Sequence, residues 1–238
     1  MTNMSANNSD RRIIYHGSQF VVERPVFGVG KVHNDYGLGF YCTEDVELAK
    51  EWAVSEEHDG YANRYELNLS GLKVLNLAKR PYHTLHWLSV LVENRVFDMD
   101  GDVIAAAAAY LSANFVVDYA SQDVVIGYRA DDNYFSFARG FLNGTLSYGQ
   151  LSRAIRLGGL GLQVVLKSRR AFAALRPLGY ERALRADCLK ARRNREDAAR
   201  RAFVEIRRQG FLPQELYMVN IMQQEIKGDD VRLSAVLS

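Results

Sequence analysis

The sequence predicts an α+β fold, and three features of its 238 residues lead to that class. Short segments rich in β-branched and aromatic residues, bounded by glycine, indicate strands near the start and again in the second half. The middle consists of helix-forming residues with few breakers. Beyond about residue 180 the chain becomes arginine-rich with a thin apolar stripe, the pattern of an amphipathic helix with a basic polar face. Strands and helices grouped in this way are typical of the α+β class.

The predicted strands are short. The first is a buried strand that ends in a turn at Gly17, and a glycine-punctuated loop separates it from the second. The third shows the apolar alternation of a half-buried strand and continues after Gly71. In chain order the predicted strands are RRIIYHGS (11–18), GFYCT (39–43), NRYELNLSGLKVLNL (63–77), a strand or turn at DVVIGY (123–128), and GLQVVLKS (161–168).

The predicted helices fill the middle and the end of the chain. The first has Thr43 as its N-cap, acidic residues in its first turn and apolar residues at helical spacing. Gly158 and Pro177 mark the ends of two later helices. In chain order the predicted helices lie within 43–57, 82–97, 103–117, 129–144, 147–158, 169–180, 181–210 and 215–226, the last of which also fits a strand.

Composition indicates a packed globular chain. Hydrophobic residues make up 48% and charged residues 24%, and a net charge of +2 gives no reason of its own to expect a nucleic-acid or membrane partner. The N-terminal segment MTNMSANNSD lacks the apolar core of a secretory signal, and the most apolar run (103–117) is shorter than the ~20 residues of a membrane span. Cys42 and Cys188 match no metal or redox spacing, so a reduced, cytoplasmic protein is expected.

We therefore expect a polar leader, one main domain, and an arginine-rich helical extension that packs on the same domain. These three parts are expected at residues 1–12, 13–180 and 181–238.

Three short patterns resemble chemical motifs but lack part of what each motif requires. GVGK (28–31) lacks the earlier glycine and the following Ser or Thr of a phosphate loop, which favours a plain turn. His83 and His86 have the i, i+3 spacing of metal ligands on a helix, but without a third ligand no metal site is predicted. Cys42 and His16 form a conceivable nucleophile pair, although a Cys beside an aromatic residue on a short strand is more often a small buried residue.

His16 and Tyr41 are the strongest candidates for one shared pocket. A His at the end of a strand, followed by Gly17 and Ser18, can point its ring into a cleft that a ligand approaches closely. A Tyr near Gly39 can offer a flat ring for stacking. Together they suit a ligand with a hydroxylated sugar and an aromatic ring, such as a nicotinamide nucleotide. The alternative is ordinary strand and turn structure.

The same residues carry a resemblance to a known superfamily. The series YHGS … DYGLGFYCTEDVELAKEWA … RYELNL resembles the first half of an ADP-ribosyltransferase domain of the diphtheria-toxin and poly(ADP-ribose) polymerase type. From Ile13 onward nearly the whole chain is also similar to an uncharacterised bacterial domain family with YHGS and GFYxT signatures. The resemblance implies a split β-sheet core with a helical middle insertion and C-terminal helices.

The resemblance implies that the protein takes NAD as substrate, without a metal, and transfers ADP-ribose to a macromolecular acceptor. His16 would hydrogen-bond the adenosine-side ribose, Tyr41 would stack on nicotinamide, and the backbone of Gly17 and Ser18 would lie close to the ligand. Arg129 is expected either to bind the pyrophosphate through its planar fork or to form a surface salt bridge. The further NAD-contacting residues that the resemblance implies are Gly39, Phe40 and Thr43, the last as the cap of the helix behind Tyr41.

Gln163 departs from the superfamily pattern at the third catalytic position. A Glu there usually contacts the 2′-hydroxyl of the nicotinamide ribose, and its charge stabilises an oxocarbenium-like state. A Gln can hold the ribose but supplies no negative charge. Three outcomes are open: transfer that depends less on a base, recruitment of another acid, or loss of catalysis. The acids considered are Glu66, Asp131 and Asp132, the last two of which equally fit a solvated helix N-terminus.

Three functions therefore remain open from the sequence. The first is a cytoplasmic bacterial ADP-ribosyltransferase, for which the resemblance implies a toxin role and a neutralising antitoxin. The second is a catalytically inactive module that binds NAD or ADP-ribose, an interpretation favoured by Gln163. The third is a nucleic-acid-interacting protein that works through the arginine-rich helix. That helix also fits simple packing on the domain or binding to an acidic partner, and its interspersed acidic residues weaken the nucleic-acid interpretation.

Overall fold

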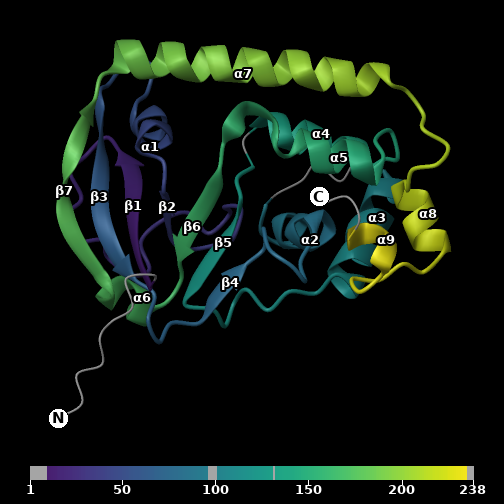
Figure 1. The fold of residues 1–238 in the computed structure, drawn as a ribbon, viewed down its shortest axis with the longest axis horizontal. Helices are drawn as coiled ribbons and strands as arrows, with labels where there is room; N and C mark the ends of the chain where they lie inside the picture. Colours follow the sequence, from purple (N-terminus) through teal and green to yellow (C-terminus); the bar gives the residue numbers. More distant parts are fainter. Residues whose placement is uncertain (1–9, 96–100, 131, 235–238) are drawn as a thin grey trace.

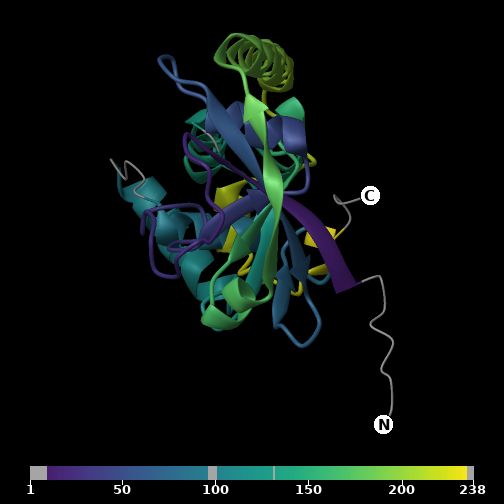
Figure 2. The same cartoon turned by 90° about the vertical axis from the view of Figure 1, so that its left-hand side faces the viewer.

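The computed structural model describes residues 10–95, 101–130 and 132–234. Figure 1 shows a twisted sheet, a group of helices beside one half of it, and one long helix that crosses the whole molecule. In Figure 2, turned by 90°, the long helix is seen nearly end-on above the sheet. The predicted α+β class is confirmed, because the described residues form a seven-stranded mixed sheet with helices and a long C-terminal helix.

The strands in the described part of the chain form one sheet with the order β4-β5-β6-β2-β1-β3-β7. They are β1 (Arg11–Ser18), β2 (Phe40–Thr43), β3 (Gly60–Asn68), β4 (Val74–Asn76), β5 (Val124–Tyr128), β6 (Leu162–Leu166) and β7 (Leu175–Ala183). Neighbouring strands are antiparallel except β4 and β5, which run parallel. The longest pairings join β1 with β3 and β3 with β7, so these three strands form a continuously hydrogen-bonded part of the sheet.

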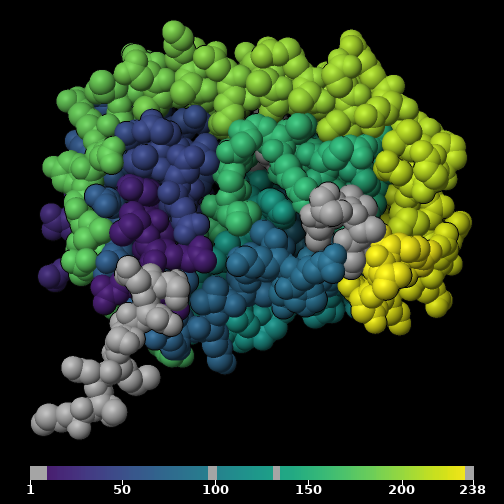
Figure 3. Space-filling view, viewed as in Figure 1, coloured from purple at the N-terminus to yellow at the C-terminus, as the bar shows by residue number. Residues whose placement is uncertain are grey.

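The helices gather mainly beside the other half of the sheet (Figure 1). They are α1 (Val46–Ala53), α2 (Thr84–Asn94), α3 (Asp102–Asn114), α4 (Asp132–Leu142), α5 (Tyr148–Ala154), the 3₁₀ turn η2 (Leu157–Gly159), α6 (Arg169–Ala173), α7 (Arg185–Arg208), α8 (Met218–Gln223) and α9 (Val231–Ser234). Helix α1 lies on β1 and β3, and α7 contacts α1, η2 and α5 along its length. Figure 3 shows α7 as a continuous ridge of atoms above these segments.

Strand alternation divides the core into two layers, because successive side chains of a strand point to opposite faces. Val125 of β5 and Val165 of β6 belong to a large apolar cluster with Trp87 and other residues of α2 to α5. Their neighbours Val124 and Val164 belong to a smaller cluster on the opposite face. Complete burial of each such side chain stabilises the fold by roughly 1.5–3 kcal/mol. The central strands are therefore apolar on both faces.

The sheet opens between β1 and β2. The registered pairing between them is a single pair, Tyr15 with Thr43, whereas β1 and β3 are paired over eight successive residues. Beyond that pair the two strands are joined through a side chain, since the Nδ1 atom of His16 lies 2.8 Å from the backbone oxygen of Tyr41. This opening places the ends of both strands beside the cavity described below.

Two predicted boundaries in the first part of the chain are wrong. Gly17 is not a turn, because β1 continues through it to Ser18. Thr43 is not the N-cap of α1, because it is the last residue of β2. The cap is Asp45, whose side chain accepts hydrogen bonds from the backbone N–H groups of Glu47 and Leu48.

The predicted helix 169–180 is also wrong beyond its first turns, because α6 ends at Ala173 and β7 follows directly. Strand β7 is mostly exposed and contains Pro177, since it lies at the edge of the sheet, where a missing N–H and charged side chains are tolerated. Such a strand has no apolar alternation for a sequence to show. Consequently α7 begins at Arg185 rather than at residue 181.

Candidate functional site

A cavity of about 560 Å³ lies where the sheet opens, between the ends of β1 and β2, β6 and the first half of α7. Its wall combines two aromatic rings, four guanidinium groups, an imidazole, two amides and two carboxylates. The residues that form it are His16, Gly17, Asn34, Asp35, Tyr41, Trp52, Arg95, Arg129, Ala130, Gln163, Arg192, Arg195 and Glu196. Three predicted catalytic side chains from separate strands, His16, Tyr41 and Gln163, therefore meet in one cavity.

His16 is held by the neighbouring strand. Its Nδ1 lies 2.8 Å from the backbone oxygen of Tyr41, and its ring lies 4.3 Å from the ring of Phe40. A carbonyl oxygen only accepts hydrogen bonds, so Nδ1 carries the proton and Nε2 is left as an acceptor in the neutral ring. Burial lowers the pKa of His16, and the hydrogen bond to Tyr41 opposes that shift. His16 is therefore a neutral acceptor near pH 7.

Gly17 serves helix packing. A Cβ atom at this position would overlap the backbone oxygen of Ala49 and approach the backbone nitrogen of Ala53, both on α1. Gly17 therefore lets α1 lie directly on β1, which brings Trp52 of the same helix into the cavity wall. Gly17 also lies in the cavity wall, so close approach of a helix on one side accompanies the predicted closeness to the ligand site, although no turn forms there.

The hydroxyl of Tyr41 is used to fix the loop that precedes β2. It donates a hydrogen bond to the backbone oxygen of Gly37 at 2.6 Å and accepts one from the backbone N–H of Tyr36 at 3.0 Å. Burial raises the pKa of Tyr41 above its ordinary value. The neutral hydroxyl holds the loop, and the side chain takes part in the cavity wall.

Asp35, in that loop, is the acidic residue that the sequence interpretation missed. Its side chain is 4% exposed, and Oδ2 accepts hydrogen bonds from the backbone N–H of Ala130 at 2.9 Å and from Nε2 of Gln163 at 2.8 Å. Oδ1 lies 3.6 Å from Nε of Arg95. Burial raises the pKa of Asp35, while these donors and the charges of Arg95 and Arg129 oppose the shift. A buried carboxylate thus lies directly against Gln163.

The loop around Asp35 is anchored from a second side by Tyr36. The Tyr36 hydroxyl donates to the backbone oxygen of Tyr128 at 2.6 Å, and the indole N–H of Trp87 donates to the same oxygen at 3.0 Å. Gly127 leaves the space for this hydroxyl, since a Cβ atom there would overlap it. The loop is therefore fixed in place before any ligand arrives, as a preorganised site requires.

Arginine side chains line the part of the wall near α7. Arg129 lies over the ring of Trp52 with 4.1 Å between the guanidinium carbon and the ring centre. Arg195 contacts Oε2 of Glu51 through Nε at 2.9 Å and Nη2 at 2.8 Å. Arg192 lies 3.7 Å from Glu196 one turn further along α7. Such a group of guanidinium forks suits a phosphorylated ligand.

Other predicted residues lie outside this wall. Ser18 accepts a hydrogen bond from the backbone N–H of Phe20, and Phe40 lies behind the His16 ring in the smaller apolar cluster. Gly39 packs against β6, where a Cβ atom would crowd Val165. The buried hydroxyl of Thr43 accepts from the backbone N–H of Asp45.

Of the three alternative acids, only Glu66 can be placed relative to the site. Glu66 is paired with Arg11 at 3.3 Å and with Arg176 at 3.1 Å, away from the cavity wall. Asp131 and the side chain of Asp132 lie outside the described residues.

His83 and His86 form the N-terminal cap of α2. Nδ1 of His83 accepts the backbone N–H of Leu85 at 3.3 Å, and Nδ1 of His86 accepts the backbone N–H of His83 at 3.2 Å. Across residues 10–95, 101–130 and 132–234, no three His, Cys, Asp or Glu side chains are grouped as a metal site would require. None of the helices in these ranges is both long and apolar enough to cross a membrane.

Fold and site together define a single-sheet α+β domain with a polar, arginine-lined cavity at the opening of its sheet. A family model described as "Protein of unknown function (DUF3990)" matches residues 12–176, and the chain belongs to this family. The matched segment contains the sheet up to the start of β7, and α7 follows it. No curated protein and no solved structure matches the chain.

Proposed function

We propose that this protein is an ADP-ribosyltransferase-like enzyme that binds NAD in the cavity and transfers ADP-ribose to a macromolecular acceptor. The observation that carries the proposal is the meeting of His16, Tyr41 and Gln163, from three different strands, in one cavity. These are the side chains that the resemblance assigns to the two riboses and to nicotinamide. The opening of the sheet between β1 and β2 agrees with the split sheet that the resemblance implies.

The chemistry of the wall supports a dinucleotide ligand. A cavity of about 560 Å³ lies within the range of about 300–1,000 Å³ typical of small-molecule sites. The neutral Nε2 of His16 can accept a hydrogen bond from a ribose hydroxyl, and the ring of Tyr41 can stack on a heterocycle. Arg129 and Arg192 offer guanidinium groups to the diphosphate between the two nucleosides.

In the proposed reaction, the bond between ribose C1′ and the nicotinamide nitrogen breaks, and its electron pair leaves with nicotinamide, which becomes neutral. A nucleophilic atom of the acceptor then bonds to C1′ of the oxocarbenium-like ribose and loses its proton to solvent. The transition state carries positive charge on the ribose, so the protein accelerates the reaction by holding the hydroxyls and placing negative charge nearby.

The test is nicotinamide release and transfer of labelled ADP-ribose to proteins or nucleic acids of a bacterial lysate. We expect His16→Ala and Tyr41→Ala to lower both rates by about 100-fold, because each removes a positioning contact. His58→Ala is the matched control, since this His is exposed and lies outside the cavity. Retained rates in both cavity variants would contradict the proposal.

Gln163 favours a second candidate, a binding module for NAD or ADP-ribose without turnover. It predicts stabilisation of the protein against heat by NAD, with no nicotinamide release. The toxin role, the antitoxin partner and the cytoplasmic location belong to the first proposal alone. Under it, expression of the chain in bacteria arrests growth, and the His16→Ala variant does not.

A further inference from the structure

Asp35 and Gln163 form a buried pair in the cavity wall. Each side chain is about 4% exposed or less, and the bond from Gln163 Nε2 to Asp35 Oδ2 is 2.8 Å long. The Oε1 atom of Gln163 is buried and has no hydrogen-bond partner among the described residues. A buried polar atom without a partner is costly, so its presence in a cavity wall points to a ligand that donates a hydrogen bond there.

Asp35 determines which end of the Gln163 amide meets that ligand. An ionised carboxylate only accepts hydrogen bonds, so the amide nitrogen must face Asp35. The carbonyl oxygen is then the atom left to accept a hydrogen bond from a ligand hydroxyl. The backbone N–H of Ala130 and the guanidinium of Arg95 hold the carboxylate in place, so the amide cannot turn without leaving its partner.

We propose that Asp35 and Gln163 together perform the task of one carboxylate on a ribosyl substrate. Gln163 accepts a hydrogen bond from the ribose hydroxyl next to the reacting carbon. Asp35 fixes the orientation of that amide and contributes the negative charge that stabilises the oxocarbenium-like state. Asp35 is thus a positioning residue that acts through Gln163. The inference rests on the proposed function, and it gives a role to a residue to which neither the motifs nor the resemblance assigns one.

Asp35→Asn separates this electrostatic role from loop anchoring. Both close donors, Ala130 N–H and Gln163 Nε2, bond the same oxygen of Asp35, so the single carbonyl oxygen of Asn can keep both contacts. The variant therefore removes the charge, and with it the ion pair to Arg95, while keeping the two hydrogen bonds that anchor the side chain. We expect kcat for nicotinamide release to fall about 100-fold, with a Kd for NAD that changes less than about threefold. The matched control is Asp123→Asn, a buried carboxylate paired with Arg170 outside the cavity.

A second measurement keeps the inference testable if Asp35→Asn fails to fold. Gln163→Met removes the amide oxygen at similar side-chain length, and an NAD analogue without the 2′-hydroxyl on the nicotinamide ribose removes its partner. If these atoms bond each other, the analogue and the variant lower the rate by similar factors, and combining them lowers it little further. Independent, multiplying losses would overturn the assignment of Oε1.

The outcomes separate the two proposals. A wild-type protein that neither binds nor cleaves NAD contradicts the proposed function. A wild-type protein that releases nicotinamide, together with an Asp35→Asn variant that keeps its kcat, overturns only the role of Asp35. Binding of NAD without release by the wild type also overturns that role and favours the binding module.

Discussion

At the scale of single residues, one backbone carbonyl decides which nitrogen of His16 can meet a ligand. The bond from Nδ1 to Tyr41 joins two strands that are otherwise paired at only one registered position, so the same contact supports the sheet and sets the tautomer. Its neighbour Gly17 lets α1 lie on β1 and so places Trp52 in the cavity wall. These two adjacent residues of one motif therefore support both the fold and the cavity.

Gly17→Ala should destabilise the protein. The added Cβ would overlap the backbone oxygen of Ala49. Because this oxygen belongs to the backbone of α1, the overlap can be relieved only if α1 shifts away from β1. We expect a loss of about 1–3 kcal/mol in the free energy of unfolding, measured by urea denaturation. Because the same shift would displace Trp52 of α1 from the cavity wall, the affinity of the folded variant for NAD should fall together with its stability. An unchanged unfolding midpoint with lost NAD binding would instead support a ligand-contacting role for this glycine.

Residues of the site that lie in local motifs were predicted, and those brought in by long-range contacts were not. His16, Tyr41 and Gln163 were identified from strand and turn patterns and from the resemblance. Asp35 was missed, because its significance lies in a contact with Gln163, 128 residues away. An Asp in a glycine-rich loop also has the sequence appearance of an ordinary turn residue.

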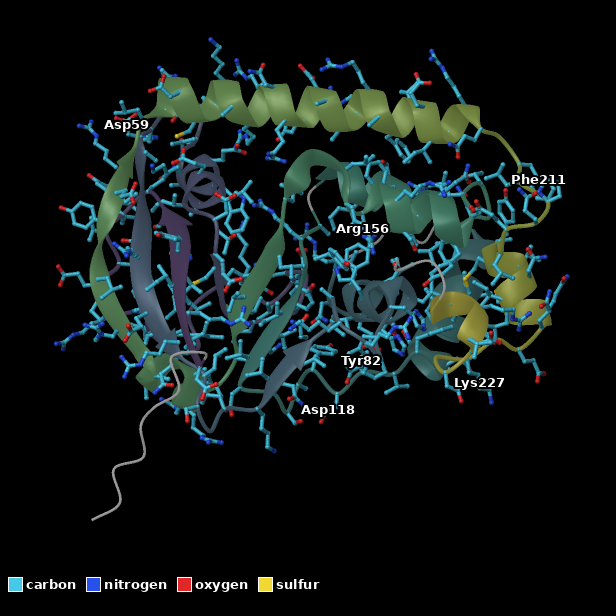
Figure 4. All side chains as sticks on the ribbon, viewed as in Figure 1. Asp59, Tyr82, Asp118, Arg156, Phe211 and Lys227 are labelled. Atoms are coloured by element: carbon cyan, nitrogen blue, oxygen red, sulfur yellow. The ribbon has the colours of Figure 1, made fainter. Side chains whose placement is uncertain are left out.

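At the scale of elements, α7 contributes to the cavity wall because acidic residues before β3 and on α1 bind its first half. Asp59 accepts the backbone N–H of Arg185 at 2.8 Å and pairs with Arg182 at 2.9 Å, and Figure 4 shows it at the junction of β7 and α7. Further along, Arg195 is paired with the nearly buried Glu51 of α1. Many basic side chains of α7 therefore have partners within the protein, which weakens the interpretation of this helix as a nucleic-acid surface.

The basic wall formed by α7 predicts a role in NAD affinity. Arg192→Ala removes one guanidinium from the cavity, and we expect the Kd for NAD to rise about tenfold, because a charge-assisted contact to the diphosphate is lost. Arg200→Ala is the matched control. Arg200 belongs to the same helix and has an acidic partner at 3.7 Å, the same distance as for Arg192, but lies outside the cavity. Isothermal titration with NAD compares the two variants, and equal losses of affinity would contradict a specific contact by Arg192.

The strand that sequence patterns do not predict is the one at the edge of the sheet. Strand β7 lies at the sheet edge with mostly exposed side chains, so neither period two nor an apolar run marks it. By contrast, β6 is buried on both faces and was recognised as an apolar strand. A strand that is buried on both faces consists of apolar residues, which the sequence shows. An exposed edge strand is defined by its pairing with a neighbouring strand, which the sequence does not show.

At the scale of the whole molecule, the C-terminal segment is tied to the helices beside the sheet by side chains that bond its backbone. His83 contacts the backbone oxygen of Gly228 through Nε2 at 3.1 Å, and the hydroxyl of Tyr148 donates to that of Leu233 at 2.8 Å. The Nδ1 atom of His83 accepts a backbone N–H, so Nε2 carries the proton and donates to Gly228. The neutral form of this ring thus joins α2 to a segment 145 residues further along the chain.

This arrangement predicts that the whole protein loses stability in mild acid. Burial lowers the pKa of His83 to about 4 and that of His86 to about 4, against an ordinary value of 6.5 in an unfolded chain. Between these values the unfolded chain binds the protons, so the free energy of unfolding falls as pH decreases from 6.5 toward 4 and is unaffected by these rings above 6.5. At pH 5 the loss from His83 is on the order of 2 kcal/mol. Protonation of Nδ1 would also place two donors against each other in the cap of α2.

Urea unfolding at pH 7 and pH 5 measures this difference in the free energy of unfolding. His83→Asn, which keeps a capping side chain that does not titrate, should reduce the difference, whereas His58→Asn at an exposed position should leave it unchanged. An equal pH dependence in wild type and His83→Asn would show that acid acts on the fold elsewhere.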